Sequence, residues 1–222
     1  MKKVLFALLA VAMLASCNND DDSNKNQKFM TSVSINGDVA VFQYDEKKNL
    51  KSISSDGDII YGFNYDGSNN LISVTDGDDA FVTLQYENGQ LESITNGDAV
   101  LPVTYNEATK KYLIGGAGIE VGLSGKDIAT VDETGGDNLL ALNYSSDNKG
   151  PFYSVPTRNV FLLPLLLELH YFMSTKPITQ VTENGTTYTT ENTYDEDGYV
   201  TQMVMKSGTE IQGTIIFQYS KL

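Results

Sequence analysis

The sequence predicts an all-β protein, an antiparallel meander of about 15–17 short strands that curls into a barrel or half-barrel. A unit of about 20 residues recurs, with its clearest copies beginning at Phe42, Phe63 and Leu84. Asn-Gly and Asp-Gly pairs separate the strands and supply the positive φ that tight hairpin turns require. So many short strands exceed what an open twisted sheet usually carries, which favours curling or closure.

Residues 1–17 are predicted to be a lipoprotein signal peptide. Two lysines precede an apolar run, Val4–Leu14, that is too short to cross a bilayer as a helix. The run ends in Leu14–Cys17, which resembles the bacterial lipobox. Cys17 is the single cysteine of the chain. We therefore expect Cys17 to carry lipid, palmitate included, that holds the protein at a membrane; the alternative is an ordinary signal peptide with an unmodified thiol.

Residues 18–28 are predicted to form a disordered acidic tether. They contain no aliphatic or aromatic side chain and include three consecutive aspartates, Asp20–Asp22, so they cannot bury apolar area to offset the entropy of ordering. An acidic cluster directly after the lipidated cysteine resembles the surface-export signal of Bacteroidetes lipoproteins. That resemblance implies an outer-membrane location, with the protein exposed on the cell surface.

Residues 29–222 are predicted to be one β-repeat domain, because repeats that share one core count as a single unit. The formal charge of the whole chain is −14, and the removed signal peptide contains two of its lysines. Such a surface repels phosphate backbones, which argues against nucleic acid as a partner.

Within each repeat, side chains should alternate between an apolar and a polar face. The period of two places Phe42 and Tyr44 on one side of their strand and leaves Gln43 on the other. The same parity recurs in the later copies, so one face of the sheet is consistently apolar. Strands of about 6 residues would reach only about 15 Å along a barrel axis, too little for the apolar band of a transmembrane barrel.

Residues 158–173 interrupt the repeat and are apolar nearly all round, which indicates burial. Helix-forming residues, with Pro164 in the first turn, predict a short buried helix at about residues 164–173. We expect it to cover the apolar face or plug one end of the sheet. The alternative is a lid over a cavity that carries a lipid or small ligand.

Few residues suit catalysis. His170 is the only histidine and lies within the apolar stretch, which makes histidine-dependent catalysis and histidine-rich metal sites hard to build. The aspartates of the turns have the oxygen ligands that calcium prefers. Aspartate is also common in turns because its side chain bonds the nearby backbone, so their presence requires no metal or cofactor. We therefore predict no catalytic residues and no enzyme, with a carboxylate-based hydrolase as a further alternative. The weak metal candidates are Asp56, Asp58, Asp76 and Asp78.

Two resemblances follow from these residues. The rhythm of Tyr44-Asp45 and Asn49-Leu50 resembles the YD repeats of Rhs-type shell proteins. Together with the lipobox, the acidic tether and the apolar insertion, the chain resembles a family of uncharacterised Bacteroidetes lipoproteins with a predicted porin-like β-barrel fold. The resemblance implies an architecture and no activity. We expect a membrane-anchored binding or structural module whose ligand, whether glycan, lipid or protein, the sequence does not identify.

Overall fold

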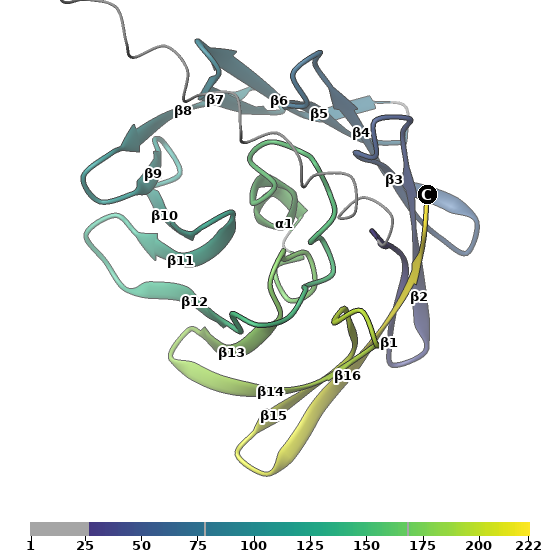
Figure 1. Ribbon diagram of the computed structural model, residues 1–222. Coiled ribbons are helices and arrows are strands. Elements are labelled where there is room, and N and C mark those ends of the chain that lie inside the picture. The colour runs from purple at the N-terminus through teal and green to yellow at the C-terminus, as the bar shows by residue number, and fades with distance from the viewer. Residues whose placement is uncertain (1–26, 78, 168) are drawn as a thin grey trace, which may run out of the picture.

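The computed structural model describes residues 27–222 apart from residues 78 and 168, and it forms a closed antiparallel barrel (Figure 1). The prediction of an all-β barrel with one short helix is confirmed. The strands are β1 (Phe29–Ile35), β2 (Asp38–Tyr44), β3 (Leu50–Ser55), β4 (Asp58–Tyr65), β5 (Leu71–Asp76), β6 (Asp79–Glu87), β7 (Gln90–Asn96), β8 (Ala99–Asn106), β9 (Lys111–Ile114), β10 (Ile119–Ser124), β11 (Asp127–Glu133), β12 (Asn138–Tyr144), β13 (Ile178–Glu183), β14 (Thr186–Tyr194), β15 (Val200–Ser207) and β16 (Glu210–Ser220).

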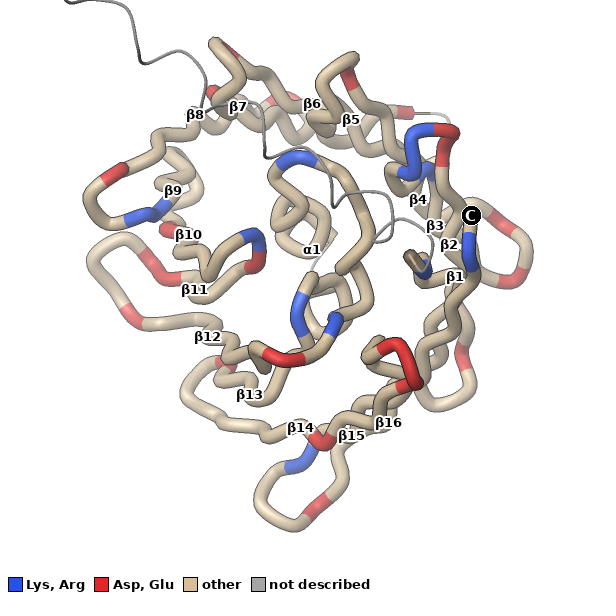
Figure 2. The backbone as a smooth tube through the Cα atoms, viewed as in Figure 1, with Lys and Arg blue, Asp and Glu red and all other residues tan. Residues whose placement is uncertain are grey.

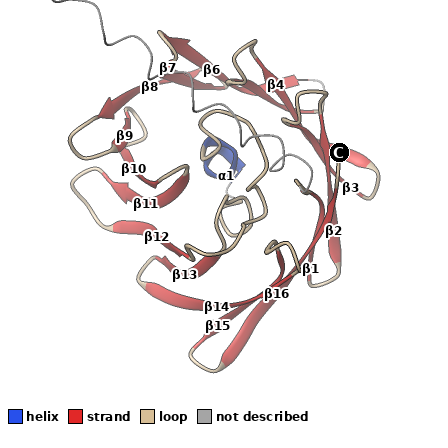
Figure 3. Cartoon of the chain, viewed as in Figure 1, coloured by secondary structure: helices blue, strands red, loops and turns tan. Residues whose placement is uncertain are grey.

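Each strand pairs with its neighbours in the chain, and β1 closes the barrel against β16. In that seam Phe29 pairs with Ser220 and Ile35 with Ile215, with a bulge between Met30 and Ser32. Closure removes the two free sheet edges that an open meander of this length would expose. Figure 3 shows the ring of strands with the helix inside it.

Side chains alternate between the barrel interior and the solvent. In β6, Val82 and Leu84 are buried while Thr83 and Gln85 are exposed. The outer face carries such polar side chains with scattered Val and Ile, and the inner face is apolar. A barrel that faces lipid has the opposite polarity, with an apolar outer band. The wall therefore has the side-chain pattern of a barrel that stands in water.

The two ends of the barrel differ in their turns. At what we call the hairpin end, tight turns such as Asn36-Gly37, Asp56-Gly57 and Asn184-Gly185 join an odd-numbered strand to the next even-numbered one. Both residues of each pair have positive φ, as the sequence predicted. At the other end, which we call the plug end, even-numbered strands lead to odd-numbered ones, and both β1 and β16 have their outer termini there.

The repeated tyrosines tie neighbouring strands together at the plug end. In four of them the hydroxyl donates a hydrogen bond to a backbone carbonyl near the start of the preceding strand. Tyr86 Oη, for example, lies 2.9 Å from the Leu71 carbonyl oxygen. Burial raises the pKa of this phenol and keeps it protonated as a donor. The other bonds of this kind join Tyr44 to Met30, Tyr144 to Ile128 and Tyr219 to Val200.

The aspartate after the tyrosine closes the plug-end turn. Asp66 Oδ1 accepts hydrogen bonds from the backbone N–H groups of Ser68 and Asn70, at 2.8 and 2.9 Å, and Oδ2 accepts from the Asn70 side chain. Asp45 accepts from the backbone of Asn49 in the same way, and Asp195 from that of Tyr199. In these repeats the tyrosine therefore links two neighbouring strands, and the aspartate that follows it closes the turn to the next strand.

A long connection between β12 and β13, residues 145–177, leaves the wall and fills the interior; we call it the inserted segment. It contains α1 (Leu162–Leu167), whose Pro164 lies in the first turn as expected. The helix is shorter than the predicted 164–173. The N–H of Leu169 bonds back to the Pro164 carbonyl, a span of five residues that ends the α-helical pattern, and the chain then turns toward β13.

Candidate functional site

The inserted segment packs its apolar side chains against the inward face of the wall. The Phe152 ring lies edge-on to Phe42 at 6.1 Å between centroids, and Phe161 lies 5.0 Å from Tyr112. Phe152 and Leu163 have no exposed surface. These contacts place the segment in the core of the barrel, so it acts as a plug, one of the two structural roles expected from the sequence.

Polar contacts at the plug end hold the inserted segment just before α1. Thr157 Oγ1 donates to the side-chain oxygen of buried Asn49 at 3.2 Å, and the Arg158 N–H donates to the Asn69 carbonyl at 3.0 Å. Asn49 and Asn69 belong to plug-end turns of the repeat. The plug-end turns that join the strands of the wall therefore also anchor the inserted segment.

A buried carboxylate fixes the exit. Asp127, the first residue of β11, accepts hydrogen bonds from the Thr175 N–H at 2.6 Å and from the Thr175 hydroxyl at 2.7 Å. Burial raises the pKa of Asp127, and the two Thr175 bonds and the nearby Lys176 charge oppose that rise only in part. Asp127 thus joins the wall to the inserted segment. Its carboxylate is buried, so removing the Thr175 hydrogen bonds would destabilise the fold.

The two limbs of the segment touch at Gly150. Its N–H donates to the Thr175 carbonyl, and the Phe152 N–H donates to the Ser174 carbonyl, both at 2.9 Å. A Cβ at position 150 would lie 2.5 Å from the Ser174 carbonyl oxygen, so only glycine allows this approach.

The far tip of the segment reaches the hairpin end. Tyr171 donates a hydrogen bond to Glu183 Oε2 at the end of β13, and His170 Nε2 lies 3.8 Å from Glu183 Oε1. Burial, followed by the Glu183 contact, raises the pKa of Tyr171. His170 is largely buried, as the sequence suggested, and is paired with a carboxylate that the sequence did not identify.

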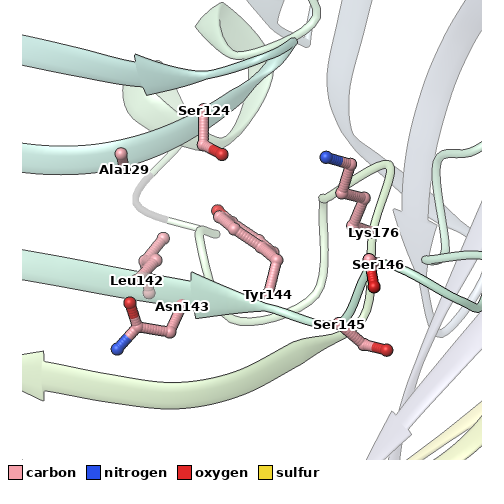
Figure 4. A pocket seen from close by; sticks show the side chains of 8 residues that line it. All are labelled: Ser124, Ala129, Leu142, Asn143, Tyr144, Ser145, Ser146 and Lys176. Atoms are coloured by element: carbon pink, nitrogen blue, oxygen red, sulfur yellow. The ribbon is translucent and has the colours of Figure 1, made fainter.

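Two cavities flank the β10–β11 hairpin where it meets the inserted segment. One, of about 330 Å³, lies between Ser124, Tyr144 and Lys176, whose side chains Figure 4 shows. The other, of about 380 Å³, is lined by Lys126, Arg158 and Phe161. A third, of about 450 Å³, lies at the hairpin end beside Glu133 and Asp137. The plug-end cavities are therefore cationic and the hairpin-end cavity is acidic.

The predicted metal candidates occupy separate exposed turns at the hairpin end. Asp56 and Asp58 border the β3–β4 turn, and Asp76 lies at the β5–β6 turn. Asp78 and Cys17 lie outside the described residues. Within residues 27–222, leaving out 78 and 168, no group of three or more His, Cys, Asp or Glu residues is placed to hold a metal ion.

Arg158, in the inserted segment, lies close enough to Asp66 in the wall for its charge to act on that carboxylate. The desolvation of Asp66 would raise its pKa, but the Asn70 and Ser68 hydrogen bonds and the Arg158 charge together lower it. This proximity depends on the path of the inserted segment, so no sequence spacing could have revealed it.

A comparison with known protein families finds a match at the N-terminus of the chain. Residues 1–18 match the model of the prokaryotic membrane lipoprotein lipid attachment site. The chain carries a lipoprotein attachment site. It is therefore a membrane-anchored lipoprotein whose described residues form a β-barrel. No curated protein matches the chain. In the part of the chain that the structure describes, no helix has the length and apolarity needed to span a membrane.

Two solved structures are similar in outline. A porin-like protein from Bacteroides vulgatus aligns with a TM-score of 0.48 and 12% identity, over 88% of this chain and 100% of that one. A porin-like protein from Bacteroides uniformis aligns with a TM-score of 0.33 and 13% identity, over 87% and 97%. At these levels neither likeness carries an argument about activity.

Proposed function

We propose that this lipoprotein is a non-enzymatic binding or structural module of the outer membrane, exposed on the cell surface. The observation that carries the proposal is the inserted segment, which fills the barrel with the chain's own apolar side chains. A wall with a polar exterior and a core closed by its own plug makes a rigid body that stands in water.

The location is supported by the N-terminus. The lipid attachment site ends at residue 18, and the acidic run Asp20–Asp22 follows at once. Protease treatment of intact cells tests surface exposure. We expect the barrel to be digested in intact cells while a periplasmic marker survives. Digestion only after the outer membrane is opened would contradict the surface location.

Native mass spectrometry of the protein, extracted from its own membrane, tests the binding or structural role. We expect the mass of the lipidated chain, alone or with a bound protein or glycan. A retained lipid or small molecule of fixed stoichiometry would instead favour a carrier, the second function that the sequence left open.

Substrate profiling separates the module from an enzyme. We expect no hydrolysis of glycoside, ester or phosphoester panels above a heat-denatured control. Turnover lost on substituting a pair of carboxylates, with the fold retained, would replace the proposal with a carboxylate-based hydrolase.

A further inference from the structure

The positive charges of the barrel gather at one end. Every Lys and Arg among the described residues lies at the plug end except Lys206, which is near the hairpin end of β15. Figure 2 marks Lys and Arg in blue, including on the inserted segment inside the ring, and Asp and Glu in red. The plug-end set comprises Lys28, Lys47, Lys48, Lys51, Lys110, Lys111, Lys126, Lys149, Arg158, Lys176 and Lys221.

The hairpin end is acidic. Its turns carry carboxylates that are nearly all exposed, whereas the acids of the plug end are interspersed with the cations. The hairpin-end carboxylates are Asp38, Asp56, Asp58, Asp76, Asp79, Asp98, Glu133, Asp137, Glu183 and Glu210. The barrel is therefore electrostatically polar along its axis, although its overall charge is negative.

The lipid is attached on the side of the plug end. β1 begins there with Phe29, about 12 residues after Cys17, and a fully extended chain covers at most about 3.5 Å per residue. The barrel body thus stays within about 40 Å of the membrane, with the plug end as its point of attachment.

Four cations of the plug end are available to an outside partner. Lys126, Lys149, Arg158 and Lys176 make no ion pair within 4.0 Å among the described residues, whereas Lys28 and Lys111 are paired with carboxylates. Lys126 and Arg158 line the cavity of about 380 Å³, and Lys176 lines the one of about 330 Å³.

An aromatic side chain lies among these cations. The Lys149 amine is 5.3 Å from the ring centroid of Tyr153 and 4.6 Å from that of Tyr199. Tyr153 is 52% exposed, although it follows fully buried Phe152. Exposed tyrosine beside lysine is the side-chain pairing found where proteins meet lipid headgroups.

We propose that the plug end lies against an anionic lipid surface, where Lys126, Lys149, Arg158 and Lys176 contact lipid phosphates. The acidic hairpin end is then repelled by the same surface and faces outward. Each Lys or Arg near such a surface strengthens association about fivefold, so these four side chains fix the orientation of a barrel that its lipid alone would leave free to tumble.

Amine-reactive labelling of the lipidated protein, read by mass spectrometry, tests this orientation. The protein is compared in detergent, in phosphatidylcholine vesicles and in vesicles of phosphatidylcholine mixed with phosphatidylglycerol. We expect labelling of Lys126, Lys149 and Lys176 to fall several-fold in the mixed vesicles at low salt, and to recover in high salt. Lys206 should label equally in all three and serves as the internal control.

A charge-reversed variant completes the test. K126E/R158E/K176E should lose the protection of Lys149 in the mixed vesicles, whereas K206E should retain it. Thermal melts of both variants establish that each is folded. Equal labelling of the plug-end lysines in all three preparations of the parent protein, or protection of Lys206 in their place, would overturn the proposal.

Discussion

The wall of the barrel and the inserted segment differ in how far along the chain each residue finds its partner. In the wall, Asp66 bonds to Asn70 within one turn, and apart from the β1–β16 seam each strand pairs with its neighbours in sequence. In the inserted segment, Thr157 bonds to Asn49, 108 residues away, and Thr175 bonds to Asp127. Local partners repeat along the sequence, whereas long-range partners occur once. A periodic sequence therefore specifies the wall, and single contacts specify what fills it.

The largest effect should come from the buried packing of the inserted segment. Phe152→Ala removes a fully buried ring that packs on Phe42, so we expect a loss of about 3–5 kcal/mol in the free energy of unfolding. Urea titration followed by circular dichroism measures it. The neighbouring substitution Tyr153→Ala, at a half-exposed ring, should cost less than about 1 kcal/mol. A loss for Phe152→Ala as small as that for Tyr153→Ala would show that the segment is not part of the core.

The next largest effect on stability should come from the hydrogen bonds between Asp127 of the wall and Thr175 of the inserted segment, which we call the clasp. Asp127→Ala leaves the Thr175 N–H and hydroxyl without their acceptor, which should cost about 2–3 kcal/mol. Asp147→Ala, at an exposed position of the same segment, is the matched control and should change stability little. If limited proteolysis cuts residues 145–177 no faster in Asp127→Ala than in the parent protein, the clasp is not what holds the segment.

A turn of the wall should matter less. Asp66→Ala removes the acceptor of three hydrogen bonds in one plug-end turn, and we expect a cost of about 1–2 kcal/mol at neutral pH. Asp79→Ala, in an exposed hairpin-end turn, provides the comparison and should cost less. An equal cost would remove the special role of the Tyr-Asp turn.

The two aspartates should respond to acid in opposite directions. The folded pKa of Asp66 is lowered below its usual 3.8, so its contribution is present above that value and is lost as pH falls through the folded pKa. The folded pKa of Asp127 is raised, so its contribution is greatest below the unfolded pKa and declines as pH rises through the folded pKa. In acid, the stability gap between parent and Asp66→Ala should shrink, and the gap for Asp127→Ala should widen.

The smallest effect on stability should come from removing one tyrosine hydrogen bond between neighbouring strands. Tyr86→Phe keeps the ring and removes the hydrogen bond to the Leu71 carbonyl, at a cost of about 1 kcal/mol. Tyr188→Phe is the control, because the Tyr188 hydroxyl makes no hydrogen bond to the described residues. A thermal melt resolves the difference. If both variants melt alike, the tyrosines stabilise the wall through ring packing alone.

Much of the wall could be predicted from the sequence. The alternation around Val82 and Leu84 gave the inward face, and pairs such as Asn36-Gly37 gave the turns, because both features depend on residues close in the chain. The partner of the Tyr86 hydroxyl could not be predicted, since it depends on how strands stagger around the barrel.

The inserted segment was predictable only in its burial. Apolar residues around Pro164 indicated a short helix in the interior, which is confirmed. The sequence placed its end too late, because Leu169 bonds back to Pro164 and the chain beyond it turns to bring Tyr171 and His170 to Glu183. The anchoring pairs at Asn49 and Asp127 depend in the same way on the path of the chain.

The seam between β1 and β16 has a mechanical consequence. The described chain enters β1 at Phe29, so a pull on the anchored N-terminus would act along this strand, while the antiparallel hydrogen bonds to β2 and β16 run across its axis. A pull from the membrane therefore loads both ladders in shear, with their bonds strained together and not unzipped one after another. The strand that closes the barrel is also the first to bear any force between the barrel and its anchor.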